Sequence, residues 1–150
     1  MNNLSFHITD ITANSIRANA SEIGLSVEEQ DTRIVIRITD NGSGMDAETA
    51  RRVTNPFYTT RTTRKVGLGL PFLIQNAEQT GGSVTLTSEP GKGTEVRAVF
   101  HSDHIDCPPW GDLPGTVALL ITGNPEINVC FEYRSGETGY SCLLYTSDAA

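Results

Sequence analysis

Mostly apolar positions near the start of the chain recur at helical spacing, namely Leu4, Ile8, Ile11, Ser15 and Ala18, of which Ser15 alone is polar. A recurrence every three to four residues is the period of one face of an amphipathic helix. We therefore expect a helix over about residues 5–18, with the hydroxyl of Ser5 as its N-cap.

Strict alternation of apolar and polar residues then predicts strands. Leu25 and Val27 alternate with polar neighbours, and Arg33–Thr39 alternates throughout, so these segments are typical of a hairpin. The same pattern predicts a second pair of strands at Ser83–Ser88 and Thr94–Phe100, on either side of the turn sequence Glu-Pro-Gly-Lys-Gly.

Two helices are expected between these strand pairs. Asp46 is placed to cap a short helix. A longer helix over about residues 69–80 tolerates Pro71 in its first turn and stops at two glycines. Residues 55–66 are polar and aperiodic, which predicts a loop. The order α-β-β-α-α-β-β indicates an α+β sandwich and not a regular βαβ alternation.

The character of the sequence changes after His101. The segments TVALLIT (116–122) and INVCFEYR (127–134) predict two more strands, whereas the final SCLLYTSDAA follows no pattern and resembles a truncated terminus. The charge changes as well, because the last third holds one basic residue against seven acidic ones. We therefore divide the chain into a domain over residues 1–102 and an acidic C-terminal extension over residues 103–150.

Composition excludes several classes of protein. The chain has 150 residues and a net charge of −7, which argues against a nucleic-acid binder or a membrane-surface binder. No apolar run approaches the ~20 residues of a membrane span. The N-terminus lacks the basic and apolar regions of a secretory signal. Three cysteines without a CxxC pair favour reduced thiols in a cytoplasmic protein.

Three separated segments fit one nucleotide site. Asp10 and Asn14 lie four residues apart and share a helix face. Asp40 ends a strand and leads into a Gly-Ser-Gly segment, where a planar ligand can approach the backbone. Gly67–Leu70 opens a helix, whose free N–H groups can hold phosphate oxygens. A carboxylate for an amino group, an amide oxygen for a metal and a phosphate cradle together predict a Mg-nucleotide site.

Two commoner glycine motifs do not fit this chain. The dinucleotide-binding fingerprint needs an acidic residue ~20 positions further on, and no Asp or Glu occurs between Glu48 and Glu78. The P-loop needs Ser or Thr directly after its Gly-Lys pair, whereas Gly93 follows Lys92.

The three segments, in this order, resemble the N box, the D-x-G-x-G box and the G-L-G-L box of the histidine-kinase-like ATPases. This GHKL superfamily has the Bergerat fold, and the chain is most similar to the ATP-binding domain of sensor histidine kinases. Asn55–Thr60 resembles the F box and Glu89–Thr94 the closing hairpin, so the resemblance covers about residues 5–100. It implies a two-layer α/β sandwich with a mixed sheet, with ATP bound between the helices and the sheet.

The resemblance also implies residue roles. Asn14 matches the asparagine that coordinates Mg²⁺, and Asp40 matches the aspartate that accepts a hydrogen bond from the adenine amino group. Asp10, the candidate catalytic residue, stands where many relatives carry a longer glutamate as general base. The other positions matched to ATP contacts are Gly42, Gly44, Arg61, Arg64, Lys65, Gly67, Leu68, Gly69 and Thr94.

Within this set, the resemblance implies that Gly42 and Gly44 let the base sit close and that Gly67 and Gly69 bend around the phosphates. Thr94 matches a hydroxyl residue that helps to fix the base. Arg61, Arg64 and Lys65 match the ATP lid, where their charge can neutralise phosphate. Lys65 and Val66 replace a glycine pair that sensor kinases often carry, which predicts a more basic and less flexible lid.

Three functions stay open at this point. The first is a stand-alone protein kinase that transfers phosphate to His or Ser of a partner protein, since His7 lies inside a helix and is interpreted as structural. The alternative is a non-catalytic ATP-sensing regulatory module whose lid controls partner binding. A slow ATPase that drives dimer closure is the third. The donor-rich segment His101–Cys107 is interpreted as surface residues and not as a metal site.

Overall fold

The computed structural model describes residues 3–54, 69–136 and 140–145. The helices are α1 (Leu4–Arg17), α2 (Ala47–Thr54), α4 (Gly69–Gln79) and α5 (Leu113–Gly123). The strands are β1 (Glu22–Gln30), β2 (Arg33–Asp40), β3 (Ser83–Glu89), β4 (Gly93–His101), β5 (Asn128–Ser135) and β6 (Tyr140–Tyr145).

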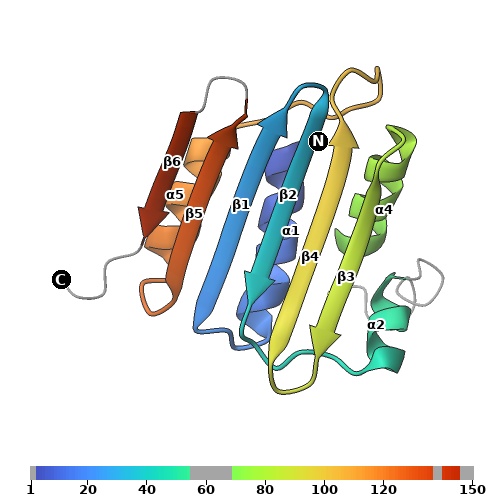
Figure 1. Ribbon diagram of the computed structural model, residues 1–150. Helices are drawn as coiled ribbons and strands as arrows, with labels where there is room; N and C mark the ends of the chain where they lie inside the picture. The colour runs from blue at the N-terminus through green and yellow to red at the C-terminus, as the bar shows by residue number, and fades with distance from the viewer. Residues whose placement is uncertain (1–2, 55–68, 137–139, 146–150) are drawn as a thin grey trace.

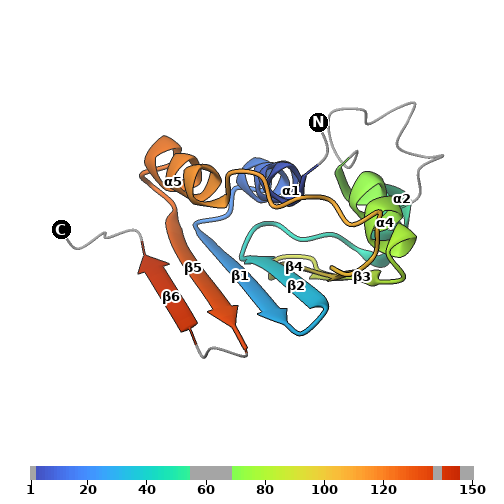
Figure 2. The same ribbon diagram turned by 90° about the horizontal axis from the view of Figure 1, so that it is seen from above.

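The strands form one six-stranded sheet in the order β3-β4-β2-β1-β5-β6. The β1–β5 pair is parallel and the other pairs are antiparallel. Helices α1, α4 and α5 lie on one side of the sheet, and Figures 1 and 2 show its other face open in the described part of the chain. The predicted α+β fold, a two-layer sandwich with a mixed sheet, is confirmed.

Helix α1 begins earlier than the sequence predicts. Asn3 is the N-cap, and its side chain accepts a hydrogen bond from the backbone N–H of Phe6 at 2.6 Å. Ser5 is buried instead, and its hydroxyl donates to the carbonyl of Trp110 at 2.7 Å. The prediction of Ser5 as the cap is therefore wrong, because a segment distant in the sequence supplies its hydrogen-bond partner.

The register of β2 against β4 positions the candidate site. Ile38 pairs with Val96, and two residues further on Asp40 pairs with Thr94. Because side chains alternate between the two faces of a strand, the buried Ile38 and Val96 place Asp40 and Thr94 on the same face. Asp40 and Thr94 therefore lie next to the hydrophobic core at one end of β2 and β4, on the side of the sheet that the helices cover.

The segment 116–122, which was expected to be a strand, belongs to helix α5. Asp112 caps this helix and accepts from the N–H of Gly115 at 3.0 Å, and Pro114 lies in its first turn. A short apolar run cannot distinguish a buried helix from a buried strand by its periodicity. The final segment SCLLYTSDAA, for which no pattern was found, contains residues 141–145 of β6, and β6 pairs with β5.

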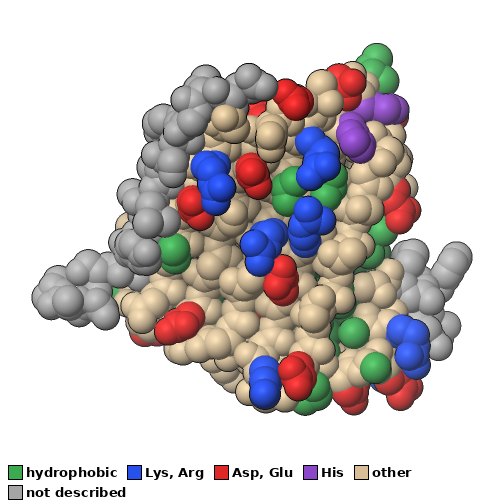
Figure 3. All heavy atoms as spheres, in the orientation of Figure 1, with side chains coloured by type: hydrophobic (Ala, Val, Ile, Leu, Met, Phe, Trp, Pro, Cys, Tyr) green, Lys and Arg blue, Asp and Glu red, His purple; other side chains and the backbone are tan. Residues whose placement is uncertain are grey.

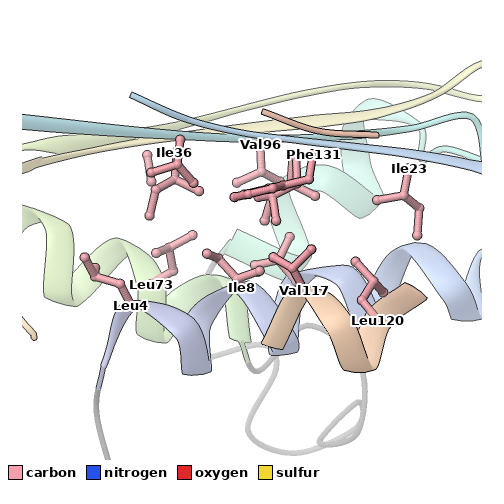
Figure 4. Packing of buried hydrophobic residues seen from close by; sticks show 14 of the residues in the cluster. Leu4, Ile8, Ile23, Ile36, Leu73, Val96, Val117, Leu120 and Phe131 are labelled. Carbon is pink, nitrogen blue, oxygen red and sulfur yellow. The ribbon is translucent and has the colours of Figure 1, made fainter. Parts of the chain in front are cut away.

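One hydrophobic core joins the two parts of the sequence. Buried side chains of α1, α4 and the central strands contact those of α5 and β5, as Figure 4 shows for Ile8, Leu73, Val117, Leu120 and Phe131. Residues 113–135 therefore share their sheet and core with the preceding residues. None of the described helices has the length and apolar character that crossing a bilayer requires.

Candidate functional site

A pocket of about 460 Å³ opens between the helices and the sheet where β2 and β4 end beside α1. Its size is typical of small-molecule sites, which measure roughly 300–1,000 Å³. Most of its wall is apolar, and Asp40 is the only carboxylate among the described residues that line it. The wall consists of Ile11, Asn14, Ser15, Arg17, Ala18, Ile38, Asp40, Ser43, Gly44, Met45, Thr49, Val53, Leu70, Thr94 and Val96.

Two hydrogen bonds hold the Asp40 carboxylate in place. The hydroxyl of Ser15 donates to Oδ2 at 2.6 Å, and the N–H of Gly42 donates to Oδ1 at 2.8 Å. An ionised carboxylate has about four acceptor positions, so capacity is left for a donor on a ligand. The pocket therefore presents a fixed group that accepts hydrogen bonds and does not donate them.

Asn14 and Arg17 lie together on the α1 side of the pocket. The guanidinium of Arg17 donates to Oδ1 of Asn14. An amide oxygen suits Mg²⁺, which commonly takes few protein ligands and keeps water or substrate phosphates as the others. A guanidinium suits phosphate oxygens. The residues on this wall therefore fit a metal–phosphate group.

The Gly-Ser-Gly segment closes tightly against its neighbours. Gly44 has a φ of +71°, and a Cβ atom there would lie 2.0 Å from the carbonyl oxygen of Glu89. A Cβ at Gly42 would lie 2.8 Å from the carbonyl oxygen of Ala18, which also accepts from the N–H of Ser43 at 3.0 Å. The glycines thus let the rim of the pocket fit between the end of α1 and the β3–β4 turn.

Thr94 is held by a second serine that the sequence did not single out. Its hydroxyl lies 2.8 Å from the hydroxyl of Ser88, which also accepts from the N–H of Met45 at 2.8 Å. Ser88 therefore ties the β3–β4 hairpin to the glycine segment and fixes the wall that carries Thr94.

Asp10 lies beside the pocket and not in its wall. It contacts the start of α4, where a Cβ at Gly69 would come within 2.9 Å of the Asp10 Cβ atom. Burial raises the pKa of the Asp10 carboxyl above its usual value, and the nearby charge of Arg17 opposes this shift. A raised pKa brings a carboxylate closer to the range in which a general base is effective near neutral pH.

Most of the described residues predicted for the site come together. Asn14, Asp40, Gly44 and Thr94 line the pocket, while the predicted positions that adjoin it are Asp10, Gly42 and Gly69. The other predicted positions lie outside the described residues, namely Arg61, Arg64, Lys65, Gly67 and Leu68.

The sequence reasoning missed several polar residues of the site, among them Arg17, Ser15 and Ser88. Arg17 could have been found, because it follows Asn14 by three positions on the same helix face. Ser15 and Ser88 carried no local signal, since their partners Asp40 and Met45 lie 25 and 43 residues away in the chain.

The segment His101–Cys107 lies elsewhere, beginning at the last residue of β4. Within the described ranges, no group of three His, Cys, Asp or Glu side chains is arranged to hold a metal ion. The imidazole Nδ1 of His104 lies 3.9 Å from a carboxylate oxygen of Asp106, and both side chains are exposed.

Comparisons with known proteins agree with this geometry. Residues 3–104 match the HATPase_c family, described as histidine kinase-, DNA gyrase B-, and HSP90-like ATPase. Sensor histidine kinase YxdK of Bacillus subtilis is 29% identical over 104 residues, which cover 65% of this chain and 32% of the relative. Sporulation kinase C of Bacillus subtilis is 30% identical over 101 residues, which cover 66% of this chain and 23% of the relative.

Among solved structures, the N-terminal domain of a DNA repair protein superposes with a TM-score of 0.63 at 19% identity. That match covers 100% of this chain and 54% of the other, and it shows a shared fold. The chain spans about a third or less of the length of the two curated kinases, at 32% and 23%.

Proposed function

Because this chain belongs to the family of histidine kinase-, DNA gyrase B- and HSP90-like ATPases, we propose that its ATP-binding domain holds Mg-ATP in the pocket beside Asp40 and serves a protein kinase. Phosphate transfer would go to His or Ser of a partner protein. A stand-alone arrangement and a cytoplasmic location are part of the proposal. The free thiols of Cys107 and Cys130 are compatible with that location.

The geometry of Asp40 carries the nucleotide part of the proposal. Its carboxylate is fixed by Ser15 and Gly42 at the polar end of a mostly apolar pocket. Adenine offers an amino group where guanine places a carbonyl, and an acceptor-only carboxylate binds the first and repels the second. The site therefore favours ATP over GTP.

The α1 side of the pocket supports the phosphate part. Oδ1 of Asn14 would bind Mg²⁺, and Arg17, which donates to that oxygen in this structure, would bind a phosphate oxygen. Bound Mg²⁺ would neutralise charge on the transferred group. Asp10 would accept a proton from the acceptor side chain. The lid residues Arg61, Arg64 and Lys65, together with Gly67 and Leu68 of the G-L-G-L box, are assigned to the phosphates from the family resemblance.

Calorimetric titration with ATP, ADP and GTP, with and without Mg²⁺, tests the binding site. We expect ATP to bind at least tenfold more tightly than GTP, and Asp40→Asn to weaken ATP about tenfold or more. A hydrogen bond to a charged group contributes roughly 1.5–3 kcal/mol, and about 1.4 kcal/mol is a factor of ten.

Asp46→Asn is the matched control for that titration. Asp46 is exposed and accepts from the N–H of Thr49 at 2.8 Å, outside the pocket lining. Equal affinities for ATP and GTP, or equal losses in the two variants, would contradict the assignment of Asp40 to adenine.

Incubation of the chain with labelled ATP and with the proteins that co-purify with it tests the proposed kinase activity. We expect transfer to a partner, and we expect Asn14→Ala to abolish it because the metal ligand is lost. Nucleotide binding without transfer would refute the kinase and leave the ATP site intact.

The second candidate function is an ATP-sensing module that does not transfer phosphate. The position of Asp10 beside the pocket, with a shorter side chain than the usual glutamate, favours it. This module requires partner affinity to differ between the nucleotide-free, ADP and ATP states. Equal affinity in all three states would refute it.

A further inference from the structure

The open face of the sheet carries a basic patch over β2 and β4. Three successive outward-facing rungs pair Arg33 with His101, Val35 with Val99, and Arg37 with Arg97. We call these six residues the open-face patch. In Figure 3, which views the molecule from this side, basic side chains surround hydrophobic ones over these two strands.

The charges of the patch are poorly balanced. Arg37 and Arg97 lie directly opposite each other, and like charges in this position destabilise a sheet. Nε of Arg37 donates to Oε2 of Glu95 at 3.1 Å. Neither Arg33 nor Arg97 forms an ion pair with any other described residue. Part of the positive charge is therefore left without a partner in the described structure.

The surroundings of the patch only partly compensate this charge. On the β1 side, Glu28 lies opposite Val35. On the β3 side, Ser83 lies opposite Val99 and Thr85 lies opposite Arg97. The open-face patch therefore combines three arginines and a histidine with two adjoining carboxylates, Glu28 and Glu95, in a chain whose net charge is −7. Further across the same face, Arg134 and Glu132 of β5 form an ion pair with each other.

We propose that the open-face patch docks an acidic segment of a partner protein in which carboxylates flank an aliphatic side chain. Guanidinium groups bind carboxylates in a bidentate manner, and arginine is enriched at protein interfaces. Val35 and Val99 separate the Arg33 rung from the Arg37–Arg97 rung. Val35 is only 9% exposed, whereas Val99 is partly exposed. An aliphatic side chain can therefore pack on Val99 and on the arginine stems, while carboxylates reach the arginines on either side.

The charge of the rest of the molecule favours a protein segment over a longer polyanion. Nucleic acid and anionic membranes extend well beyond a patch of three rungs. The net charge of −7 and the carboxylates of Glu28 and Glu95 repel such extended surfaces. A short acidic segment can contact Arg33 and Arg97, which have no ion-pair partner among the described residues, without covering the acidic surface around the patch.

The patch and the nucleotide pocket lie on opposite faces of the same strands. Ile38 and Val96 line the pocket, whereas their chain neighbours Arg37 and Arg97 belong to the patch. Docking therefore leaves the pocket accessible, and we expect the segment to bind equally with and without ATP. The inference consequently does not depend on the proposed kinase activity.

Fluorescence anisotropy of the labelled peptide Glu-Glu-Leu-Glu-Glu, added to the full chain at low salt, tests the proposal. We expect saturable binding that weakens with added salt. We also expect an affinity loss of tenfold or more in the Arg33→Gln/Arg97→Gln double variant. The matched control is Arg51→Gln/Arg52→Gln, which removes two exposed arginines from α2 and should change affinity less than twofold.

A stability measurement separates docking from a structural role. Removing one of two opposed charges relieves repulsion, so Arg97→Gln should raise Tm by about 1–3 °C while it weakens peptide binding. Loss of peptide binding together with a fall in Tm would overturn the proposal, because the arginine would then be structural.

Three further outcomes would also overturn it. The first is no binding by the wild-type chain, and the second is equal losses in the patch and control variants. The third is patch-dependent binding of oligothymidylate or phosphatidylserine vesicles in place of the peptide, which would assign the face to nucleic acid or to membrane.

Discussion

His7 lies in the core at 1% exposure, and only one of its ring nitrogens has a hydrogen-bond partner among the described residues. Nε2 lies 2.7 Å from the side-chain nitrogen of Asn76, while Nδ1 is buried without a partner. The ring packs against Phe72 and Phe100. Burial lowers the pKa of His7 from 6.5 to about 4, so the ring stays neutral near pH 7. This environment agrees with its interpretation as a structural residue.

This histidine makes the stability of the protein depend on pH. The unfolded chain binds a proton below pH 6.5, whereas the folded chain binds it only near pH 4. The contribution of His7 is therefore complete above pH 6.5 and is lost as the pH falls towards 4, by up to about 3 kcal/mol. Urea unfolding at pH 7 and at pH 4.5 measures this loss.

His7→Gln should remove most of that pH dependence, because glutamine does not titrate. His104→Gln is the control, since it replaces a histidine whose side chain is exposed. If the free energy of unfolding of His7→Gln still differs between the two pH values as much as that of the wild type, other groups cause the pH dependence.

At the scale of elements, the contact between the Gly-Ser-Gly segment and the β3–β4 turn shapes the pocket. Gly91 and Gly44 both have positive φ, at 79° and 71°. Their surroundings differ, because a Cβ at Gly91 meets nothing within 4 Å, whereas one at Gly44 would lie 2.0 Å from the Glu89 carbonyl oxygen. The pair therefore separates the cost of the backbone conformation from the cost of the steric clash.

We expect Gly91→Ala to destabilise the protein by about 1–2 kcal/mol, the cost of a left-handed residue with a Cβ. Gly44→Ala should cost at least twice as much and should also weaken ATP binding, because the rim must move. Urea unfolding and calorimetry of both variants test this. Equal losses of stability in the two variants would show that the Gly-Ser-Gly segment moves away from the Glu89 carbonyl at no additional cost in free energy.

At the scale of the molecule, residues after 102 extend the sheet and the core of the preceding residues. β5 pairs with β1, and Val117 and Phe131 belong to the core cluster. The loop before α5 also binds α1, because the carbonyl of Trp110 accepts from the hydroxyl and the N–H of Ser5. Since Ser5 lies on the helix that carries Asn14, these residues help to position the site.

This arrangement predicts one cooperative unfolding transition. Phe131 is 6% exposed, so Phe131→Ala should lower the free energy of unfolding by roughly 3–5 kcal/mol. Leu119 is 73% exposed, and Leu119→Ala should change it little. Far-UV circular dichroism reports on the whole chain, and the fluorescence of the single tryptophan, Trp110, reports on the C-terminal part. Separate transitions by the two probes would support independent folding of residues 103–150.

The candidate site was predictable where its residues form local motifs. The i, i+4 spacing of Asp10 and Asn14 and the glycines after Asp40 can be recognised in the linear sequence. The structure then places Asn14 and Asp40 in one pocket. Ser15, Ser88 and the capping role of Asn3 were missed. For the two serines, the identity of the residue reveals nothing until a distant strand or loop supplies the partner.

The sequence by itself determined the element order up to residue 100, the α+β class and the chemistry available for a nucleotide. Hydrophobic periodicity and turn residues act over a few neighbouring positions, so the linear sequence is sufficient to recognise the elements that they specify. Only the tertiary structure decided that 116–122 is helical, that β5 lies parallel to β1, and that Arg37 faces Arg97 across the open sheet. Those outcomes depend on pairing and burial between distant segments, and local patterns do not encode that pairing.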